Sequence, residues 1–312
     1  MTALDTAHLY REHGAHLRGL CYRMTGSAAD ADDLVQETFV RALTSPPAAA
    51  GSLRPWLTRV ALNLGRDLLR ARRRQAYPGP WLPSPMATTT DDGAPLPDLE
   101  PPTTEGRYDV LESVSYAFLL ALEELTGTQR AVLILRDVLD TPVDETAAAL
   151  GLSEANVKTT LHRARATLAA HDQGRRLRRP THADREQNQA ALFELFRALQ
   201  AGDSEAMVRV LRRDVRAVTD GGGVYHAARL PIVGADKLAL FLRKLLARRG
   251  PPAGVELRVL NALPALVVRY GAGDPRESPL QVVRCDLDED GLIQEIHTIM
   301  APRKLTALGL PG

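Results

Sequence analysis

The sequence predicts a multidomain protein in which two all-α domains, the second a helix-turn-helix, precede an α+β domain with a curved antiparallel sheet. Three observations lead to this fold class. Apolar residues recur at helical spacing in the first half of the chain, and β-branched residues alternate with polar ones after about residue 211. Two stretches rich in proline, glycine and polar residues separate these parts, which places domains at 1–76, 109–171 and 185–312 and linkers at 77–108 and 172–184.

The domain at 1–76 is expected to contain three helices. Residues 5–24 carry apolar side chains at helical spacing, and Gly26 stands where a helix C-cap belongs. Asp30 is expected to cap the second helix, whose apolar stripe faces the core while acidic residues occupy the opposite face. A third helix is expected to open at Pro55 and to run into the arginines at 70–74.

Residues 77–108 are expected to form a linker without regular structure, because proline, glycine, threonine and aspartate dominate them. Four helices follow, at about 110–125, 128–139, 143–150 and 153–170. After the basic linker the chain predicts helices at 185–201, 203–211 and 235–248. Strands are expected in VRAVTD, VELRVLN, PALVVRY, LQVVRCDL and LIQEIHTIM.

Charge is strongly segregated although the 312 residues carry a net charge of only +1. Residues 54–74 hold seven arginines and one acidic residue, and residues 153–179 hold seven basic and two acidic residues, whereas residues 81–106 have no lysine or arginine. Two basic patches separated by an acidic spacer are typical of contacts with a polyanion at two places, although solvated helix faces would give the same pattern.

Cysteine usage and hydropathy exclude several classes of protein. Cys21 and Cys285 are far apart and belong to no CxxC pair or Cys/His cluster, so we expect two buried thiols, no disulfide and no metal site. No run of residues is long and apolar enough for a membrane helix, and the N-terminus lacks a signal peptide. A cytoplasmic protein without membrane contacts follows.

The stretch VDETAAALGLSEANVKTTLHRARATL, residues 143–168, is typical of a helix-turn-helix. Ala147 is small where two helices must touch, Gly151 permits the tight turn, and Val157 points back into the core. An ordinary helical hairpin with a basic surface remains the alternative. In the DNA-binding interpretation Ser153 caps the second helix, and residues on its exposed faces contact phosphates and base edges: Glu154, Asn156, Lys158, Thr159, Thr160, Arg163 and Arg165.

Two segments resemble a known family. DADDLVQETFVRAL and RPWLTRVALNLGRDLLRARRR resemble region two of extracytoplasmic-function (ECF) sigma factors, and LTGTQRAVLILRDVLDTPVDETAAALGLSEANVKTTLHRARATL resembles region four. YPGPWLPSP at 77–85 and DGGG at 220–223 resemble the group that carries a fused SnoaL-like C-terminal domain. The resemblance implies an RNA polymerase sigma factor that is not an enzyme, needs no cofactor, and binds core RNA polymerase through the largest-subunit clamp helices and the flap.

The resemblance also implies roles for individual residues. An acidic face on the second helix, made by Asp32, Asp33, Gln36 and Glu37, would dock on the basic clamp helices. The loop from Thr44 to Arg54 and the following helix would melt and read the promoter −10 element, and region four would read the −35 element. The contacts with the separated promoter DNA strand would come from Arg54, Trp56, Arg59, Asn63, Arg66, Arg70, Arg72, Arg73 and Arg74. Trp56 is the weakest of these, since a helix tryptophan more often packs in a core.

The C-terminal domain is expected to have the cone-shaped SnoaL-like fold, in which a curved sheet wraps helices around a pocket that can hold a small ligand. In this family the domain regulates the sigma modules in cis. The regulatory contact would involve Tyr77, Gly79, Pro80, Trp81, Leu82 and Pro83 in the linker and Asp220, Gly221, Gly222 and Gly223 in DGGG. The chain departs from the family pattern at APRKL, residues 301–305, where Asn-Pro-Asp-Lys-Leu is usual, and at Val224, where a basic residue is usual.

Two other functions compete with this interpretation. A cyclase- or isomerase-like enzyme would draw on the titratable residues of the last domain, namely Asp220, Tyr225, His226, Asp286 and His297. A one-component transcription regulator would combine a ligand pocket with an autonomous helix-turn-helix. Neither explains the first 75 residues, which carry an acidic helix and an arginine-rich helix.

Overall fold

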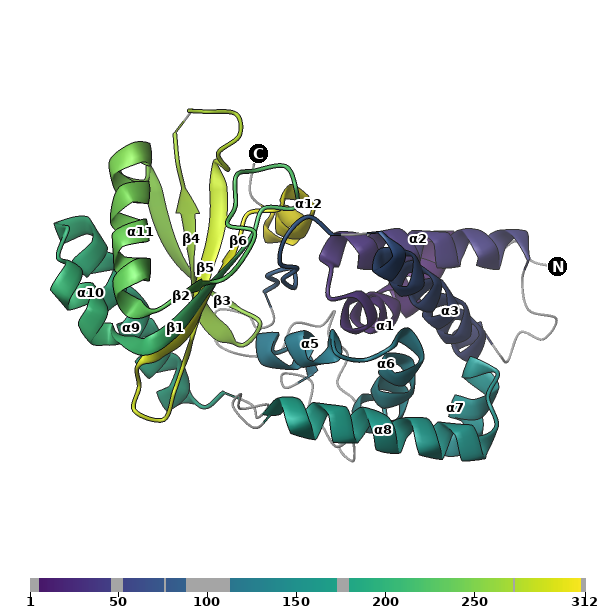
Figure 1. The fold of residues 1–312 in the computed structure, drawn as a ribbon. Coiled ribbons are helices and arrows are strands. Elements are labelled where there is room, and N and C mark those ends of the chain that lie inside the picture. Colours follow the sequence, from purple (N-terminus) through teal and green to yellow (C-terminus); the bar gives the residue numbers. More distant parts are fainter. Residues whose placement is uncertain are drawn as a thin grey trace. The chain divides into compact units, whose positions relative to one another are not determined.

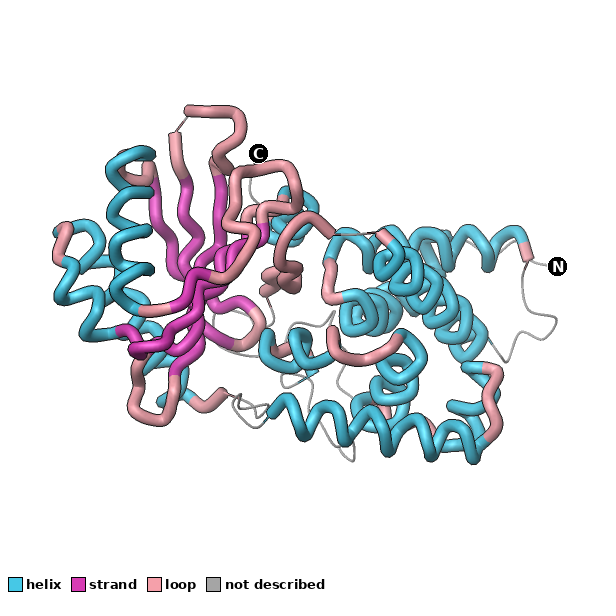
Figure 2. The backbone as a smooth tube through the Cα atoms, in the orientation of Figure 1, coloured by secondary structure: helices cyan, strands magenta, loops and turns pink. Residues whose placement is uncertain are grey.

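The computed structural model describes residues 6–45, 53–75, 77–87, 113–172, 180–271 and 273–309. The chain divides into two compact units (Figures 1 and 2). One comprises Met1–Ala76 and Thr88–Arg179, and the other comprises Tyr77–Ala87 and Pro180–Gly312. The linker segment YPGPWLPSP therefore packs as part of the C-terminal unit. The loop expected to read the −10 element lies largely outside the described residues, at 46–52.

The first unit is all helical within its described residues. Its elements are α1 (Thr6–Thr25), α2 (Ala28–Thr44), α3 (Leu53–Arg74), α5 (Tyr116–Leu122), α6 (Gly127–Leu133), a π-helical continuation (Ile134–Val138), α7 (Val143–Leu150) and α8 (Glu154–Asp172). Helices α1, α2 and α3 pack on one another, and α3 also packs on α6 and α7. The helices of the two predicted all-α domains thus share one unit.

Two helix starts differ from the prediction. Ser27, and not Asp30, is the N-cap of α2, because its hydroxyl accepts the backbone N–H of Asp30 at 3.3 Å. Helix α3 begins at Leu53, two residues before Pro55, which still lies in the first turn where its missing N–H costs nothing. A proline or a capping side chain in the sequence therefore locates the start of a helix only to within a few residues.

The second unit is the α+β cone that the sequence predicts. Its elements are α9 (His182–Ala201), α10 (Ser204–Val210), β1 (Leu211–Asp220), β2 (Ile232–Val233), α11 (Ala235–Arg249), β3 (Gly254–Leu260), β4 (Leu263–Arg269), β5 (Leu280–Leu287), β6 (Ile293–Ile299), α12 (Pro302–Leu305) and a 3₁₀ turn (Thr306–Leu308). Helices α9, α10 and α11 lie on one face of the sheet (Figure 1). Leu192, Met207, Val215, Leu238 and Ile293 are among the buried residues between these helices and the sheet.

The sheet is mixed, whereas the sequence predicts a wholly antiparallel one. The strand order is β2-β1-β6-β5-β4-β3, and β1 pairs with β6 in parallel while every other pairing is antiparallel. The four strands β3 to β6 form a meander with short connections, whereas β1 continues directly from α10 and joins the free edge of β6. Side-chain alternation identifies a strand but carries no information about its direction. The short strand β2 was not predicted.

Candidate nucleic-acid and polymerase surfaces and the linker contact

The outer face of α2 combines acidic and apolar side chains. Asp33, Gln36 and Glu37 are exposed, and Glu37 forms an i, i+4 ion pair with Arg41 at 2.9 Å. Val40, on the same helix, is 51% exposed. Asp32 is half-buried because it turns toward Arg18, whose Nε lies 2.7 Å from its carboxylate. This surface can therefore offer negative charge together with apolar area to a basic partner.

Helix α3 is amphipathic, with Leu57, Ala61, Leu62, Gly65 and Leu69 buried. The residues that are predicted to contact the separated DNA strand differ in how exposed they are. Arg54, Arg59 and Arg70 are exposed, although Arg70 also pairs with Asp67 at 2.7 Å. Trp56 and Asn63 are half-buried. The exposed arginines leave a cationic face that nucleic acid phosphates can approach.

Three other arginines of α3 contact backbone carbonyls within the same unit. Arg66 donates to the carbonyl of Leu150 at 3.4 Å, and Arg73 donates to the carbonyl of Leu125 at 2.6 Å. These acceptors lie in the segment that carries the helix-turn-helix. Arg72 instead pairs with Asp30 at 2.7 Å and donates to the carbonyl of Thr25 at 2.9 Å. In the structure Arg66 and Arg73 therefore bond to backbone carbonyls of the protein, whereas the sequence predicts that they contact DNA.

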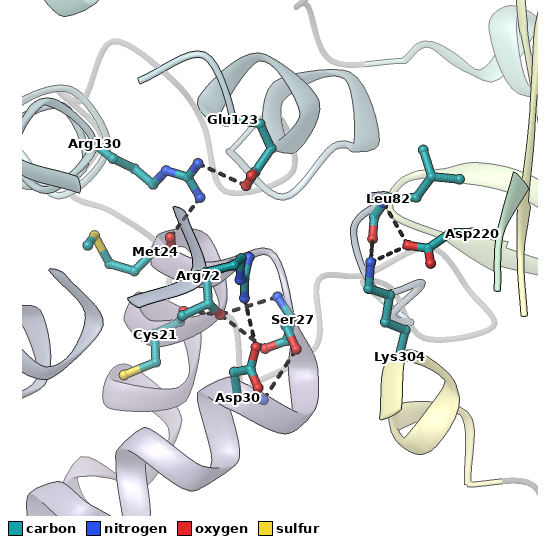
Figure 3. Close-up of polar contacts among 11 residues, drawn as sticks. Cys21, Met24, Ser27, Asp30, Arg72, Leu82, Glu123, Arg130, Asp220 and Lys304 are labelled. Atoms are coloured by element: carbon teal, nitrogen blue, oxygen red, sulfur yellow. Dashed lines mark hydrogen bonds and ion pairs between the residues drawn. The ribbon is translucent and has the colours of Figure 1, made fainter. Parts of the chain in front are cut away.

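The arginine contacts of α3 join helices α1–α3 to helices α5–α8, and we call this set of contacts the junction. Buried Arg130 strengthens the junction (Figure 3). Its guanidinium donates to the carbonyls of Met24, at 2.8 Å, and Leu122, at 2.6 Å, and pairs with Glu123 at 2.8 Å. The Met24 carbonyl belongs to the last turn of α1, where helix carbonyls lack intrahelical partners. Burial lowers the pKa of Arg130, and the Glu123 carboxylate opposes this shift. Nothing in the local sequence pattern indicates that this arginine is structural.

The helix-turn-helix forms as predicted in α7 and α8. Gly151 adopts the left-handed conformation (φ 64°) at the end of α7, and the N–H of Leu152 bonds to the carbonyl of Ala147 at 3.0 Å. Ser153 caps α8 through the N–H of Asn156 at 3.2 Å, and Val157 is fully buried. Most of the predicted readout residues are exposed, namely Glu154, Asn156, Lys158, Thr159 and Arg163, while Thr160 is half-buried.

Arg165 differs from the other predicted readout residues. Its guanidinium forms a bidentate pair with the carboxylate of Asp137 at 2.6 and 2.9 Å, and the Asp137 side chain is only 2% exposed. Such a pair fixes α8 on the π-helical segment, because a buried carboxylate needs a compensating charge. The geometry favours a structural role for Arg165.

Within the C-terminal unit, Asp220 binds the linker segment (Figure 3). One carboxylate oxygen accepts the Tyr77 hydroxyl at 2.6 Å, and the other accepts the backbone N–H of Leu82 at 2.8 Å. The ammonium group of Lys304 also pairs with this second oxygen and donates to the carbonyl of Leu82 at 2.5 Å. Asp220 is fully buried, and the Lys304 side chain is 6% exposed. We call these four residues the linker contact.

Aromatic rings complete the linker contact. The Lys304 ammonium lies 4.1 Å from the centroid of the Trp81 ring and 4.8 Å from that of Tyr77, so both rings can stabilise the cation. Farther along the segment, Asn261 accepts the N–H of Met86 at 3.1 Å and donates to its carbonyl at 2.9 Å. The segment is therefore bound at both its start and its end.

The glycines of DGGG are required by close packing. A Cβ on Gly223 would lie 2.6 Å from Cγ of Pro78, and one on Gly222 would lie 2.8 Å from Cβ of Ala301. Both residues also have positive φ, at 75° and 62°. The predicted turn is present, but its glycines are explained by the approach of the linker and the tail as much as by conformational freedom.

Sequence reasoning missed Lys304 as a member of the linker contact. The available signal was the tail APRKL, which keeps the Lys-Leu pair of the family pattern while the residues before it differ. Pro302 begins α12, and Lys304, two residues later in this short helix, lies beside Asp220. The altered residues therefore leave the cation of this contact in place.

The titratable residues that an enzyme would need do not share the cavity of about 570 Å³ in the C-terminal unit. Of the five candidates only His226 lines the cavity of the C-terminal unit, and Asp220 belongs to the linker contact. Asp286 and His297 lie together with Glu295, with possible ligand atoms within 4.8 Å of one another. Arg284 pairs with Asp286 at 2.6 Å and lies 3.3 Å from Nδ1 of His297, and this guanidinium opposes a bound metal cation.

Both cysteines are free and buried, as predicted. Burial raises the pKa of the Cys21 thiol to about 12, and it raises that of Cys285 as well. Among the residues that the structure describes, no helix combines the length and the apolar character needed to cross a bilayer.

Comparison with known proteins identifies both helical segments. Residues 9–75 match the family model of sigma-70 region 2, and residues 115–168 match that of sigma-70 region 4. The ECF RNA polymerase sigma factor SigJ of Mycobacterium tuberculosis is 34% identical over 306 residues, which cover 93% of this chain and 90% of that protein. The ECF sigma factor SigG of the same organism is 39% identical over 217 residues, 61% of this chain and 54% of its own length. The crystal structure of SigJ matches 96% of this chain and 98% of its own with a TM-score of 0.70 and 28% identity.

Proposed function

We propose a mechanism for this protein from the premise that the chain belongs to the family of ECF RNA polymerase sigma factors. It is a transcription initiation factor and not an enzyme: it binds core RNA polymerase and directs initiation at specific promoters. It acts in the cytoplasm, where its polymerase and promoter DNA are. Its C-terminal domain modulates this activity in cis through the linker contact.

The exposed acidic face of α2 docks on the basic clamp helices of the polymerase. Asp33, Gln36 and Glu37 support this role, because they are exposed and lie next to exposed Val40. Asp33→Lys should abolish run-off transcription with purified core polymerase although the variant still folds, as its far-ultraviolet circular dichroism would show. The matched control is Glu205→Lys, which reverses an exposed acid on α10 of the other unit. Equal loss of activity in both variants would contradict this docking surface.

Helices α3 and α8 contact the −10 and −35 elements. About 25 base pairs separate these elements, which is roughly 85 Å of duplex at about 3.4 Å per base pair. The first unit packs α3 against α7, which itself contacts α8, and bonds Arg66 to Leu150, so α3 and α8 lie close together and not about 85 Å apart. Promoter binding therefore requires the junction made by Arg66, Arg73 and Arg130 to open.

The linker contact controls how far this junction can open, and it is the observation that carries the proposal. Residues 76–114 connect the two DNA-reading segments and span at most about 130 Å at about 3.4 Å per residue. Holding Tyr77–Ala87 on the C-terminal domain removes up to about 37 Å of that reach. The residues of the connection outside this segment reach about 95 Å, so by themselves they span two promoter elements only when they are almost fully extended.

The test is run-off transcription with core polymerase and the full-length chain. Asp220→Ala removes the acceptor that holds Tyr77, Leu82 and Lys304, so it should free the linker and raise transcript yield severalfold. Asp236→Ala, an exposed acid at the start of α11, is the control and should leave the yield unchanged. An unchanged or lowered yield from Asp220→Ala would contradict the restraint.

A further inference from the structure

The C-terminal unit encloses a cavity of about 570 Å³ between α9, α11 and the sheet. Most of its wall is apolar, with Leu195, Phe196, Leu242, Leu266 and Ile296 among the lining residues. A volume of this size lies within the range of sites that bury most of a small molecule. An apolar wall of this kind selects a ligand with a large hydrophobic body.

Polar side chains gather at one end of the cavity. Arg249 stacks on the Tyr270 ring at 3.7 Å and pairs with Glu277 at 2.9 Å, and Gln281 donates to the Tyr270 hydroxyl at 3.4 Å. The N–H of His226 bonds to the carbonyl of Arg276 at 2.8 Å, which brings His226 to the same end.

The charge at this end is positive. The lining residues include three cations, Lys244, Arg248 and Arg249, and one carboxylate, Glu277, so two positive charges are in excess. Arg248 shares Glu277 with Arg249 and its side chain is 58% exposed, while Lys244 is exposed. The Tyr270 hydroxyl is protonated at neutral pH and can donate a hydrogen bond, and burial raises its pKa further. An anionic oxygen would find both charge and a hydroxyl donor here.

We propose that this cavity binds a small amphiphile with an apolar body and a single carboxylate, and that binding is transmitted to the linker contact. The carboxylate lies at the end lined by Lys244, Arg248 and Tyr270, and the apolar body fills the space between α11 and the sheet.

The cavity wall and the linker contact share two strand ends. Thr219 lines the cavity and precedes Asp220, while Met300 lines the cavity and donates its N–H to the carbonyl of Asp220 at 2.8 Å. On the loop after DGGG, Ala227 also lines the cavity, and its Cβ lies 2.9 Å from the position of a Cβ on Gly221. A ligand that displaces these wall residues displaces the backbone that presents Asp220 to the linker.

Binding is tested on the full-length protein with dodecanoate as the carboxylate probe, 1-dodecanol as the neutral probe and dodecylamine as the cationic one. Dodecanoate should displace 1-anilinonaphthalene-8-sulfonate and raise the melting temperature in a concentration-dependent way. Dodecanol should bind about three- to fivefold more weakly, because it lacks the charge that pairs with the exposed cations at this end. Failure of dodecanoate to bind, or equal binding of all three probes, overturns the proposal.

Two pairs of variants locate the site. Leu242→Trp fills the cavity and should abolish dodecanoate binding, whereas Leu240→Trp, on the exposed side of the same helix, should leave it intact. Lys244→Gln should weaken dodecanoate but not dodecanol, and Lys237→Gln, an exposed cation of α11 outside the cavity, should weaken neither. Binding that survives Leu242→Trp in a folded protein places the ligand elsewhere and refutes the site.

The proposal that ligand binding alters the linker contact rests on the proposed function. The following test distinguishes failure of this proposal from failure of the proposed function. Dodecanoate should change run-off transcription by the wild type but not by Leu242→Trp or Asp220→Ala. If Asp220→Ala raises the yield while dodecanoate binds without effect on the wild type, transmission is wrong and the proposed function stands. If Asp220→Ala has no effect, the proposed function fails while the binding measurements still decide the site.

Discussion

Replacing Asp220 by alanine should destabilise the C-terminal unit because it leaves a buried cation without its partner. The Asp220 carboxylate is fully buried and accepts bonds from the Tyr77 hydroxyl and from the N–H groups of Leu82 and Gly222, in addition to pairing with Lys304. Removing one partner of a buried ion pair costs about 3–5 kcal/mol. We expect a loss of that size in the free energy of unfolding.

The assay is urea unfolding followed by the fluorescence of Trp81, whose ring lies 4.1 Å from the Lys304 ammonium. The chain has two tryptophans, so Trp56→Phe makes Trp81 the sole reporter of this unit. Glu186→Ala removes an exposed partner of His182 on α9 and serves as the control, with no measurable change expected.

A double variant isolates the charge. Asp220→Ala with Lys304→Met removes both partners, and we expect it to recover part of the stability lost in the single variant, since no unpaired ion remains buried. A loss below about 1 kcal/mol for Asp220→Ala, or a double variant no more stable than the single one, would refute the reasoning that Lys304 depends on Asp220.

Three more outcomes follow from the structure. Gly223→Ala should release the linker and destabilise the C-terminal unit more than Gly250→Ala, because both positions have positive φ but only Gly223 faces a close atom, in Pro78; equal urea midpoints would contradict this. Arg163→Gln should lower promoter-specific transcription at an unchanged melting temperature, whereas Arg165→Gln should lower the melting temperature, because Arg165 neutralises buried Asp137. Cys21, with its pKa raised to about 12, should resist iodoacetamide at pH 8 in the folded protein and react only after unfolding, as mass spectrometry would show.

Periodicity and turn chemistry predicted most of the fold. The strand LQVVRCDL coincides with β5, and helix α7 has the predicted limits, because each carries a complete pattern bounded by turn residues. The sequence pattern places the N-cap of α2 at Asp30, three residues late, since Ser27 and Asp30 are both good capping residues and only the backbone decides between them.

Pairwise geometry could not be predicted in the same way. The sequence marks Arg66, Arg73 and Arg165 as basic residues on helices that suit nucleic acid, and it cannot show that their guanidinium groups meet carbonyls or a buried carboxylate. Arg130 gives no sign of burial, because arginine is usually exposed. These assignments depend on residues far apart in the chain.

The sequence by itself determined the family, the order of the domains and the existence of both DNA-reading segments, because local patterns of charge, apolar spacing and turn residues encode them. Only the tertiary structure decided the direction of β1, the role of Lys304 and the cation-rich end of the cavity. Each of those depends on contacts between residues that are tens to hundreds of positions apart in the sequence, and a local sequence pattern does not show such contacts.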